Sequence, residues 1–283
     1  MSLPFRKLGL GGGGIKGILH IGALQELERH QPLVFPDGVY GISIGSILAT
    51  YVSFGLPLDN KMTNLVEKYL SVEKIVPKLS FKDVSNAFSS KGVYSMSAFE
   101  DSIVDMFLEA GLDIRTKTLG DAKMPLYIVA SNITKGTPTV FSKNVPLLDA
   151  IKCSCCIPAM FKPQELYGQL YVDGDLFVPS LSSIVKDGLV FSLVKKTSAC
   201  ITPKTIETMH PLQYMRDLYI MSMNRVRHNE KTDLTLCLEY KHLRSDSDLS
   251  EFNIPDIFES GKKQLNDFLR SKGFCQEGTE GLR

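Results

Sequence analysis

Long apolar runs are missing from the 283-residue sequence, and so is a large excess of either charge. No stretch of about 18 apolar residues occurs, which argues against a membrane-spanning helix. The N-terminal stretch MSLPFRKLGLGGGG lacks the long apolar core of a signal peptide. With 32 basic and 31 acidic residues, the chain also lacks the basic excess typical of a nucleic-acid-binding protein. We therefore expect a cytoplasmic protein with no nucleic-acid partner, whose contact with membranes is at most peripheral.

Cysteine is scarce and clustered. Three of the six cysteines lie in the segment Cys153-Ser154-Cys155-Cys156. Paired CxxC knuckles are missing and no histidine lies near the cluster, so a zinc site is disfavoured. In the absence of a signal peptide, the sequence favours reduced thiols.

Strand and helix patterns alternate at the start of the chain. Leu8–Leu10 reads as a strand, Ile15–Arg29 as a helix, Val39–Ile42 as a strand and Ser46–Phe54 as an apolar helix. This order predicts an α/β fold with a parallel sheet. Later strands are expected at Leu126–Ser131, Thr139–Phe141, Tyr171–Val172, Leu189–Val194 and Leu234–Tyr240, and later helices at Leu147–Cys156 and Ile257–Leu269.

Neither a linker nor an internal repeat stands out, so we expect one domain over residues 1–283. The motifs lie in a core of about residues 6–180. Strands and a helix are expected over residues 181–272, followed by a frayed tail at residues 273–283.

The first motif is GxSxG, formed by Gly41, Ser43 and Gly45. A serine nucleophile is commonly held on a sharp strand-to-helix turn, where its hydroxyl is exposed and the next backbone N–H, here that of Ile44, points to the same place. A predicted strand precedes this motif and a predicted helix follows it. Ser43 is therefore the candidate nucleophile, although a Gly/Ser turn without chemistry gives the same short pattern.

The second motif is the run Gly11 to Gly17, which contains GxGxxG. A dinucleotide site would need an acidic residue at the end of the second strand. Asp37 has the right spacing but lies in the turn before that strand, which disfavours nucleotide binding. The alternative use of the glycines is an oxyanion hole, because bare backbone N–H groups can approach a developing oxyanion closely. Lys16 in the first helical turn indicates either a local role or a side chain that extends to solvent.

The third motif is Tyr171-Val172-Asp173-Gly174-Asp175. Asp-Gly between two apolar runs is typical of a hairpin turn. An aspartate at the end of a strand can also serve as a base, so both interpretations stay open. Five histidines are candidates for a base: His20, His30, His210, His228 and His242. A Ser–Asp–His order is possible with any of the last three. None has a sequence context that marks it as catalytic.

Together and in this order, the three motifs resemble those of the patatin-like phospholipase family. The glycine-rich loop G-G-G-x-[KR]-G is matched by Gly12, Gly13, Gly14, Lys16 and Gly17, and the Asp-Gly-Gly/Ala motif is matched at Asp173 and Gly174. A softer block, from Asp149 to Pro163, is also similar. Two positions depart from the family pattern. Gly11 replaces a frequent Asp, and Asp175 stands where the family has Gly or Ala.

The resemblance implies a three-layer α/β/α sandwich and a Ser–Asp dyad that cleaves acyl esters of phospholipids or other lipids. In that mechanism Asp173 takes the proton of Ser43. The N–H groups of Gly12, Gly13, Gly14 and Ile44 hold the oxyanion. Gly17, Gly41, Gly45, Gly174 and Lys16 support the motifs, and no metal or organic cofactor is required.

Two alternatives remain. One is a hydrolase of soluble esters with a histidine-completed triad, and the other is a catalytically silent lipid-binding protein of the same fold. The stretch from Lys74 to Lys91, in which lysines alternate with Phe, Ile and Leu, is either a cap that meets membranes or an ordinary solvated region.

Overall fold

The computed structural model describes most of the chain between Phe5 and Phe274. The described residues are 5–58, 60–70, 91–194, 201–209, 214–215, 217–218, 220–222, 232–240 and 253–274. The stretch from Lys74 to Lys91, except its last residue, lies outside them, as do His210, His228, His242 and most of the predicted tail. No helix among these residues has the length and hydropathy needed to cross a membrane.

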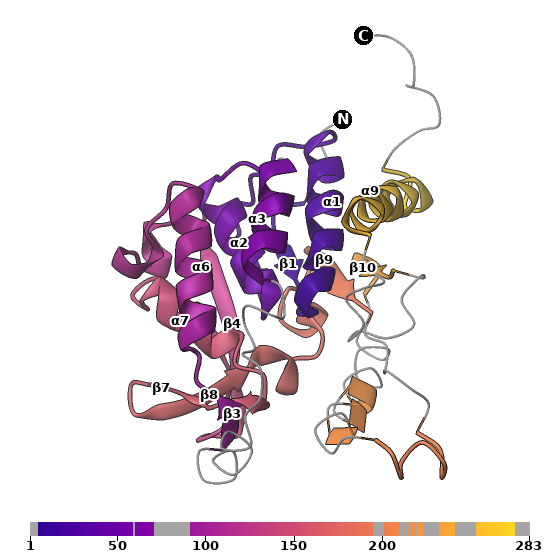
Figure 1. Cartoon of the computed structure of the whole chain (residues 1–283). Coiled ribbons are helices and arrows are strands. Elements are labelled where there is room, and N and C mark those ends of the chain that lie inside the picture. Colours follow the sequence, from indigo (N-terminus) through magenta and orange to yellow (C-terminus); the bar gives the residue numbers. More distant parts are fainter. Residues whose placement is uncertain are drawn as a thin grey trace.

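Within the described residues, an eight-stranded sheet forms the centre of the protein (Figure 1). The strands lie in the order β10-β9-β1-β2-β4-β8-β7, and β5 pairs with β4. Pairing is parallel from β10 to β4 and antiparallel beyond it. The bounds are β1 Leu8–Leu10, β2 Val39–Gly41, β4 Leu126–Asn132, β5 Thr137–Phe141, β7 Gln164–Leu166, β8 Gln169–Asp173, β9 Leu189–Leu193 and β10 Thr235–Leu238. A separate parallel pair joins β3 (Gly92–Tyr94) to β6 (Ala159–Phe161).

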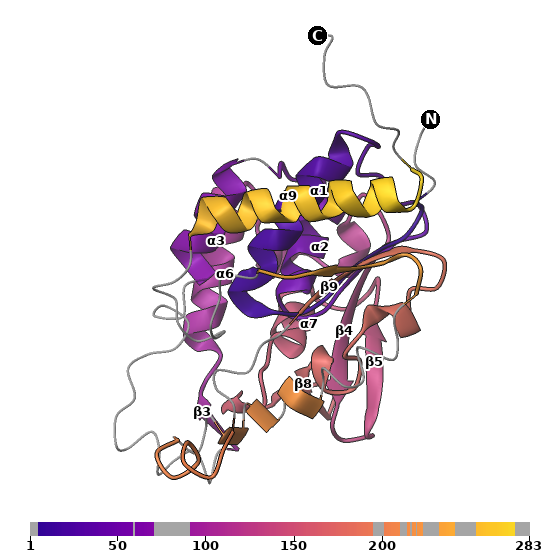
Figure 2. The same cartoon turned by 90° about the vertical axis from the view of Figure 1, so that its right-hand side faces the viewer.

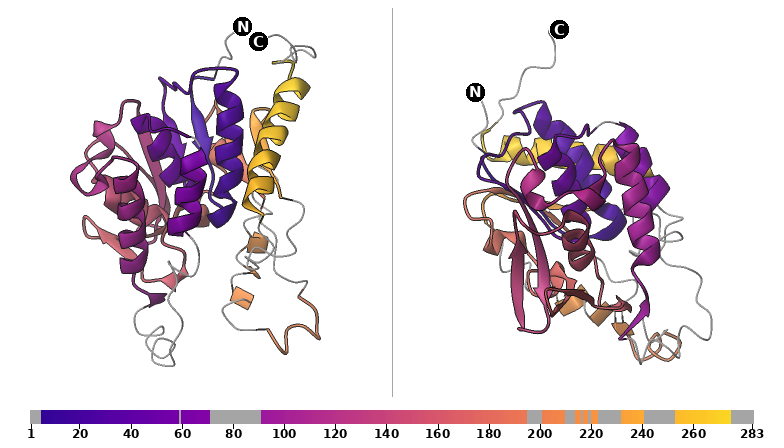
Figure 3. Two further views of the ribbon diagram at one scale, coloured as in Figure 1. Left: turned by 45° about the horizontal axis from the view of Figure 1, so that its top comes forward. Right: turned by 90° about the vertical axis from the view of Figure 1, so that its left-hand side faces the viewer.

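Helices cover one face of this sheet (Figures 1 and 3). They are α1 Gly17–Glu28, α2 Ile44–Phe54, α3 Asn60–Leu70, α6 Ser97–Glu109, α7 Leu147–Ser154 and α9 Ile254–Ser271. Helix α1 is buried nearly all round, as an apolar helix between other elements should be. The first predicted helix differs at its start, since Gly14–Lys16 form the 3-10 turn η1 before α1 begins at Gly17.

The opposite face of the sheet has a second, smaller apolar cluster. Val129 of β4, Val190 of β9 and Ile42, just beyond β2, form part of this cluster. They pack against Val178, Leu181 and Val185. The last three belong to or flank the 3-10 turns η4 (Gly174–Leu176) and η5 (Leu181–Ser183). The predicted α/β sandwich with a mainly parallel sheet is therefore confirmed. Its layer on this face consists of short turns in the part of the chain that is described.

Helix α9 crosses α1 with the two backbones in close contact (Figure 2). A Cβ atom on Gly22 would lie 2.0 Å from the carbonyl oxygen of Phe258, and one on Gly261 would lie 2.2 Å from that of Leu19. Both distances are far below van der Waals contact, so only glycine fits at either position. The last described helix is thereby fixed to the first.

Replacing Gly22 with alanine should force α1 and α9 apart. We expect Gly22→Ala to lower the free energy of unfolding by about 2 kcal/mol, within the usual cost of overpacking and despite the better helix propensity of alanine. Urea denaturation followed by circular dichroism measures the change. Lys263→Ala, on the exposed side of α9, is the control and should stay within about 0.5 kcal/mol of wild type. Equal stabilities of the two variants would contradict the close crossing.

Candidate active site

Ser43 lies in a sharp turn between β2 and α2, as the GxSxG motif predicted. Its backbone angles are φ 53° and ψ −128°, in a region that non-glycine residues rarely adopt. The turn is closed by hydrogen bonds from Gly45 N–H to Ile42 O (2.8 Å) and from Ser46 N–H to Ser43 O (2.8 Å). The serine is 8% exposed. Such strain is kept only where the surroundings hold the residue firmly, and it is common at functional sites.

The two glycines of GxSxG permit close packing around this turn. A Cβ atom on Gly45 would lie 1.9 Å from the carbonyl oxygen of Leu10, and one on Gly41 would lie 2.5 Å from Gly45 O. Helix α2 therefore begins directly against the carboxyl end of β1. This is the edge of a parallel sheet where α/β proteins usually build their sites.

The glycine-rich loop follows β1 and lies beside Ser43. A Cβ atom on Gly12 would stand 3.0 Å from the Cβ of Ser43 and 2.4 Å from Oδ2 of Asp175. Gly13 packs on the side chain of Leu193, and Gly14 has a positive φ of 59° as it enters η1. One turn later Gly17 packs against the side chain of Ile44. The loop and the serine turn, 30 residues apart in the sequence, are thus in direct contact.

Lys16 is buried rather than extended to solvent. Only 3% of the residue is exposed, and its Nζ donates a hydrogen bond to the carbonyl oxygen of Val194 (2.8 Å), just beyond β9. The solvent-facing alternative for this side chain was wrong, because the end of β9 offers a carbonyl within its reach. Lys16 ties the glycine-rich loop to the neighbouring strand.

His20 supports the same loop from beneath. It is fully buried, and its Nε2 lies 3.0 Å from the carbonyl oxygen of Gly11, with its ring stacked on Phe191. Burial lowers the pKa of His20 to about 4, so at neutral pH the ring is uncharged and donates from Nε2 to Gly11. The sequence offered His20 only as a triad candidate. Its position among Ile18, Leu19 and Ile21 was the signal of burial.

Asp173 is the last residue of β8 and lies at the level of Ser43. Gly41 faces Ile128 on β4, and Asp173 faces Ala130, two residues farther along the same strand. Ser43 is two residues beyond Gly41. Ser43 and Asp173 therefore lie at about the same position along the direction of β4. Asp173 is 4% exposed, and its Oδ1 accepts the backbone N–H of Asp175 (3.0 Å).

The hairpin interpretation of Asp173-Gly174 was wrong. The chain continues into the 3-10 turn η4, which the side chain of Asp173 caps by accepting the N–H of Asp175. The backbone of Gly174 packs closely against β4, since a Cβ atom on Gly174 would be 2.4 Å from the carbonyl oxygen of Val129. Among the described residues, β8 pairs with β4 and β7, and the chain after Asp173 forms no strand that folds back on it.

Asp175, the departure from the family pattern, points into the site. It is 2% exposed, and its Oδ2 lies against Gly12 on the side of that residue where Ser43 also lies. The site therefore has two buried carboxyl groups. Asp175 also orients Asp173, because the backbone N–H of Asp175 donates to the Asp173 carboxylate. The side chain and the main chain of Asp175 therefore contact different parts of the site.

The cysteine-rich segment Cys153–Cys156, at the end of α7, is hydrogen-bonded to both candidate residues. Ser154 accepts the backbone N–H of Ser43 (2.9 Å), and the carbonyl oxygen of Cys156 accepts that of Asp173 (2.7 Å). Burial raises the pKa of Cys155 well above its usual range, and the charge of Asp173 raises it further. Ser154 was not among the predicted site residues, although it stands in the softer block that resembles the family.

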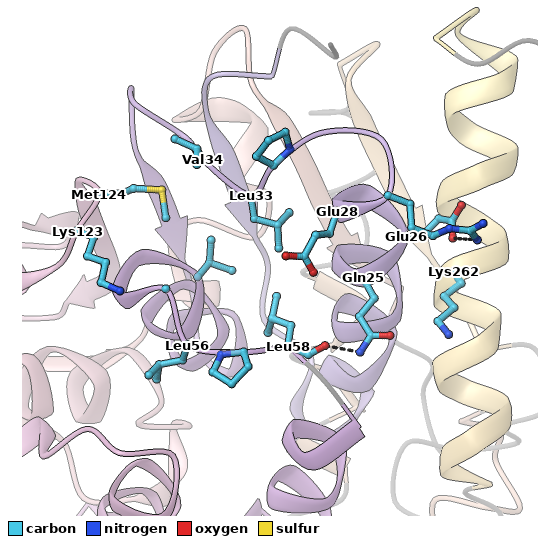
Figure 4. A pocket seen from close by; sticks show the side chains of 15 residues that line it. Gln25, Glu26, Glu28, Leu33, Val34, Leu56, Leu58, Lys123, Met124 and Lys262 are labelled. Atoms are coloured by element: carbon cyan, nitrogen blue, oxygen red, sulfur yellow. Dashed lines mark hydrogen bonds and ion pairs between the residues drawn. The ribbon is translucent and has the colours of Figure 1, made fainter. Parts of the chain in front are cut away.

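A large cavity of about 940 Å³ lies elsewhere on the protein (Figure 4). It is lined by the ends of α1 and α2 that are far from Ser43, by Lys123 and Met124, and by Lys262 of α9. Gln25 spans part of it with a hydrogen bond to the carbonyl oxygen of Leu58. Val52, on its wall, is nine residues after Ser43 along α2, which places it about 13 Å away at 1.5 Å per residue. The cavity is separate from the candidate active site.

The sequence and the fold resemble those of known proteins. A family model described as patatin-like phospholipase matches residues 8–179, which include the glycine-rich loop, Ser43 and Asp173. The chain belongs to the patatin-like phospholipase family. Within the patatin-like phospholipase match, the site residues come from three stretches that are remote in the sequence and adjacent in the fold.

Individual relatives are distant. An uncharacterized protein of Acanthamoeba polyphaga mimivirus is 26% identical over 176 residues, 60% of this chain and 57% of the viral protein. A probable lipid hydrolase of invertebrate iridescent virus 6 is 24% identical over 187 residues, 61% of this chain and 60% of that protein. The matches thus span less than two thirds of either relative. The structure of VipD from Legionella pneumophila is similar in fold, with a TM-score of 0.53 at 15% identity over 95% of this chain and 68% of VipD.

The buried His20 should make the protein sensitive to acid. Unfolded histidine takes up a proton near pH 6.5, whereas folded His20 does so only near pH 4. Its contribution to stability is therefore complete above about pH 6.5 and is lost as the pH falls toward 4, a loss of about 3 kcal/mol. Between pH 7 and pH 4, wild type should lose about that much more unfolding free energy than His20→Gln, which keeps an N–H for Gly11 but does not titrate. Parallel stability curves would refute this role.

Proposed function

We propose that this protein is a lipid acyl hydrolase that cleaves fatty-acyl esters through an acyl-enzyme on Ser43, with Asp173 as the general base. The observation that carries the proposal is the strained serine turn in direct contact with the glycine-rich loop, with a buried aspartate at the same level of the sheet. Membership of the patatin-like phospholipase family supports lipid esters as the substrate class.

In the acylation step, Oγ of Ser43 attacks the ester carbonyl while its proton passes to Asp173. The carbonyl oxygen becomes an oxyanion, and in this proposal the N–H groups of Gly12 to Gly14 and Ile44 stabilise it. The N-terminus of α2 adds the positive end of its dipole at Ile44. The tetrahedral intermediate then expels the alcohol part of the lipid, which takes the proton from Asp173 and leaves the acyl group on Ser43.

In the second step, Asp173 takes a proton from water, and the resulting hydroxide attacks the acyl-enzyme carbonyl. The same N–H groups hold the second oxyanion. Ser43 leaves, regains its proton from Asp173, and the fatty acid is released. No metal or organic cofactor enters either step. The hydrogen bond from Asp175 N–H to Oδ1 of Asp173 orients the base.

The alternative triad mechanism has less support. Of the two described histidines, His20 is occupied beneath the glycine-rich loop, and His30 lies 3.2 Å from Glu26 at the far end of α1. A silent lipid-binding role is disfavoured by the presence of Ser43 and Asp173 together in the site. The substrate is expected to be a phospholipid or lysophospholipid met at a membrane surface.

The dyad can be tested with a fluorophosphonate probe and with phospholipid and lysophospholipid hydrolysis. Ser43→Ala should abolish both signals, because it removes the nucleophile. Asp173→Asn should lower kcat by about 10²- to 10⁴-fold, the usual contribution of a general base. Asp175→Asn is the matched control. It keeps the backbone N–H that orients Asp173 and should lose less activity.

Three outcomes would overturn the assignment. Labelling that survives Ser43→Ala would exclude Ser43 as nucleophile. A larger loss in Asp175→Asn than in Asp173→Asn would transfer the role of base to Asp175. Full activity of Asp173→Asn, combined with inactivity after glutamine replacement of His210, His228 or His242, would favour the triad.

The oxyanion loop gives a second test. In Gly12→Ala the added methyl group would collide with Asp175 and crowd Ser43. We expect kcat to fall at least about 10²-fold, as when one oxyanion donor is lost. Gly14→Ala has open space for its methyl group and should lose much less activity, with a cost in stability of about 1–2 kcal/mol for its positive φ. Equal kcat values in the two folded variants would argue against an oxyanion hole at Gly12.

A further inference from the structure

A single short segment, from the last residue of α7 to Cys156, accepts the backbone N–H groups of both proposed catalytic residues. Ser43 N–H donates to Oγ of Ser154 (2.9 Å), and Asp173 N–H donates to the carbonyl oxygen of Cys156 (2.7 Å). Only Cys155 separates the two acceptors in the sequence. The proposed nucleophile and base, 130 residues apart, are therefore hydrogen-bonded to the same short piece of chain.

The Ser154 hydroxyl is itself fixed in direction. It donates to the carbonyl oxygen of Val129 (2.7 Å) on β4, so its lone pairs are left to accept the N–H of Ser43. Strand β4 lies between β2, which leads to Ser43, and β8, which ends at Asp173. Gly174 also packs on the carbonyl of Val129. Ser154 thus joins the serine turn to the strand that separates it from the base.

The segment also contacts the side chain that binds the carbonyl oxygen of Ser43. Ser46 donates its hydroxyl to Ser43 O (2.6 Å), and its Oγ also lies 3.7 Å from Sγ of Cys155. Ser154, Ser46, Cys155 and Cys156 are all buried. A buried N–H that loses its partner cannot turn to water for another, so the strained backbone of Ser43 depends on this contact.

We infer that Ser154 is a positioning residue that fixes the separation of Ser43 and Asp173, and that the segment Ser154–Cys156 is the brace between them. This inference rests on the proposed function in so far as it concerns catalysis. Ser154 touches the main chain of Ser43 and no reacting atom, so its loss should impair proton transfer rather than substrate binding. A displacement of about 1 Å in such a site can reduce the rate about 10²-fold.

The test compares Ser154→Ala with Ser53→Ala on full-length protein. Ser53 is a fully buried serine near the far end of α2 whose hydroxyl has no hydrogen-bond partner, so its replacement matches the chemical change outside the site. Ser154→Ala should lower kcat for ester hydrolysis about 10- to 100-fold with KM within twofold of wild type. Ser53→Ala should retain wild-type kcat. A wild-type kcat in Ser154→Ala would overturn the inference.

A double mutant distinguishes positioning from general damage. If Ser154 acts through the dyad, its removal matters little once the base is gone, so Ser154→Ala should change kcat less than threefold in an Asp173→Asn background. Equal fold-losses in both backgrounds would show that Ser154 serves stability alone. Ser154→Cys, which keeps the size of the side chain and a weaker acceptor, should fold and have an intermediate kcat even if the alanine variant does not.

Amide hydrogen exchange separates the brace from the proposed function. Peptides containing the amides of Ser43 and Asp173 should exchange at least about tenfold faster in Ser154→Ala than in wild type or Ser53→Ala. Unchanged exchange at both peptides would overturn the brace. Faster exchange in a protein that hydrolyses no ester would support the brace and refute the proposed function alone.

Discussion

The first turn of α2 presses against the carboxyl end of β1, and the site depends on this contact. Because Gly45 has no side chain, the helix can begin beside the carbonyl of Leu10. The chain that leaves β1 must then pass directly by Ser43, and Gly12 does so. The glycine-rich loop and the GxSxG motif are each ambiguous alone. They form one site because α2 packs against the end of β1.

The aspartate reaches the same place by a different route. It comes from the antiparallel part of the sheet, where β8 pairs with the extended end of β4. Strand β4 is longer than β2 and continues beyond the level at which β2 turns into Ser43. Because β4 is longer, Asp173 on β8 lies beyond the end of β2. The segment Ser154–Cys156 is hydrogen-bonded to both Ser43 and Asp173.

Local patterns predicted the parts of this site that are made by neighbours in the chain. The strand–turn–helix context of Ser43 and the alternation of strands and helices are confirmed. The sequence left open the features that depend on distant partners. Lys16 is buried because β9 ends beside it, and Asp173 begins a 3-10 turn because Gly174 lies on β4. The hydrogen bond of Ser154 joins residues 111 positions apart, which no local pattern encodes.

The contact between α1 and α9 bears on the order in which parts of the protein fold during synthesis. Helix α1 is the first helix of the described chain and α9 is the last. During synthesis from the N-terminus, the side of α1 at Gly22 stays uncovered until more than 250 residues have been made. Helix α1 carries His20 beneath the glycine-rich loop. The helix that carries His20 therefore gains its contact with α9 only when the described chain is nearly complete.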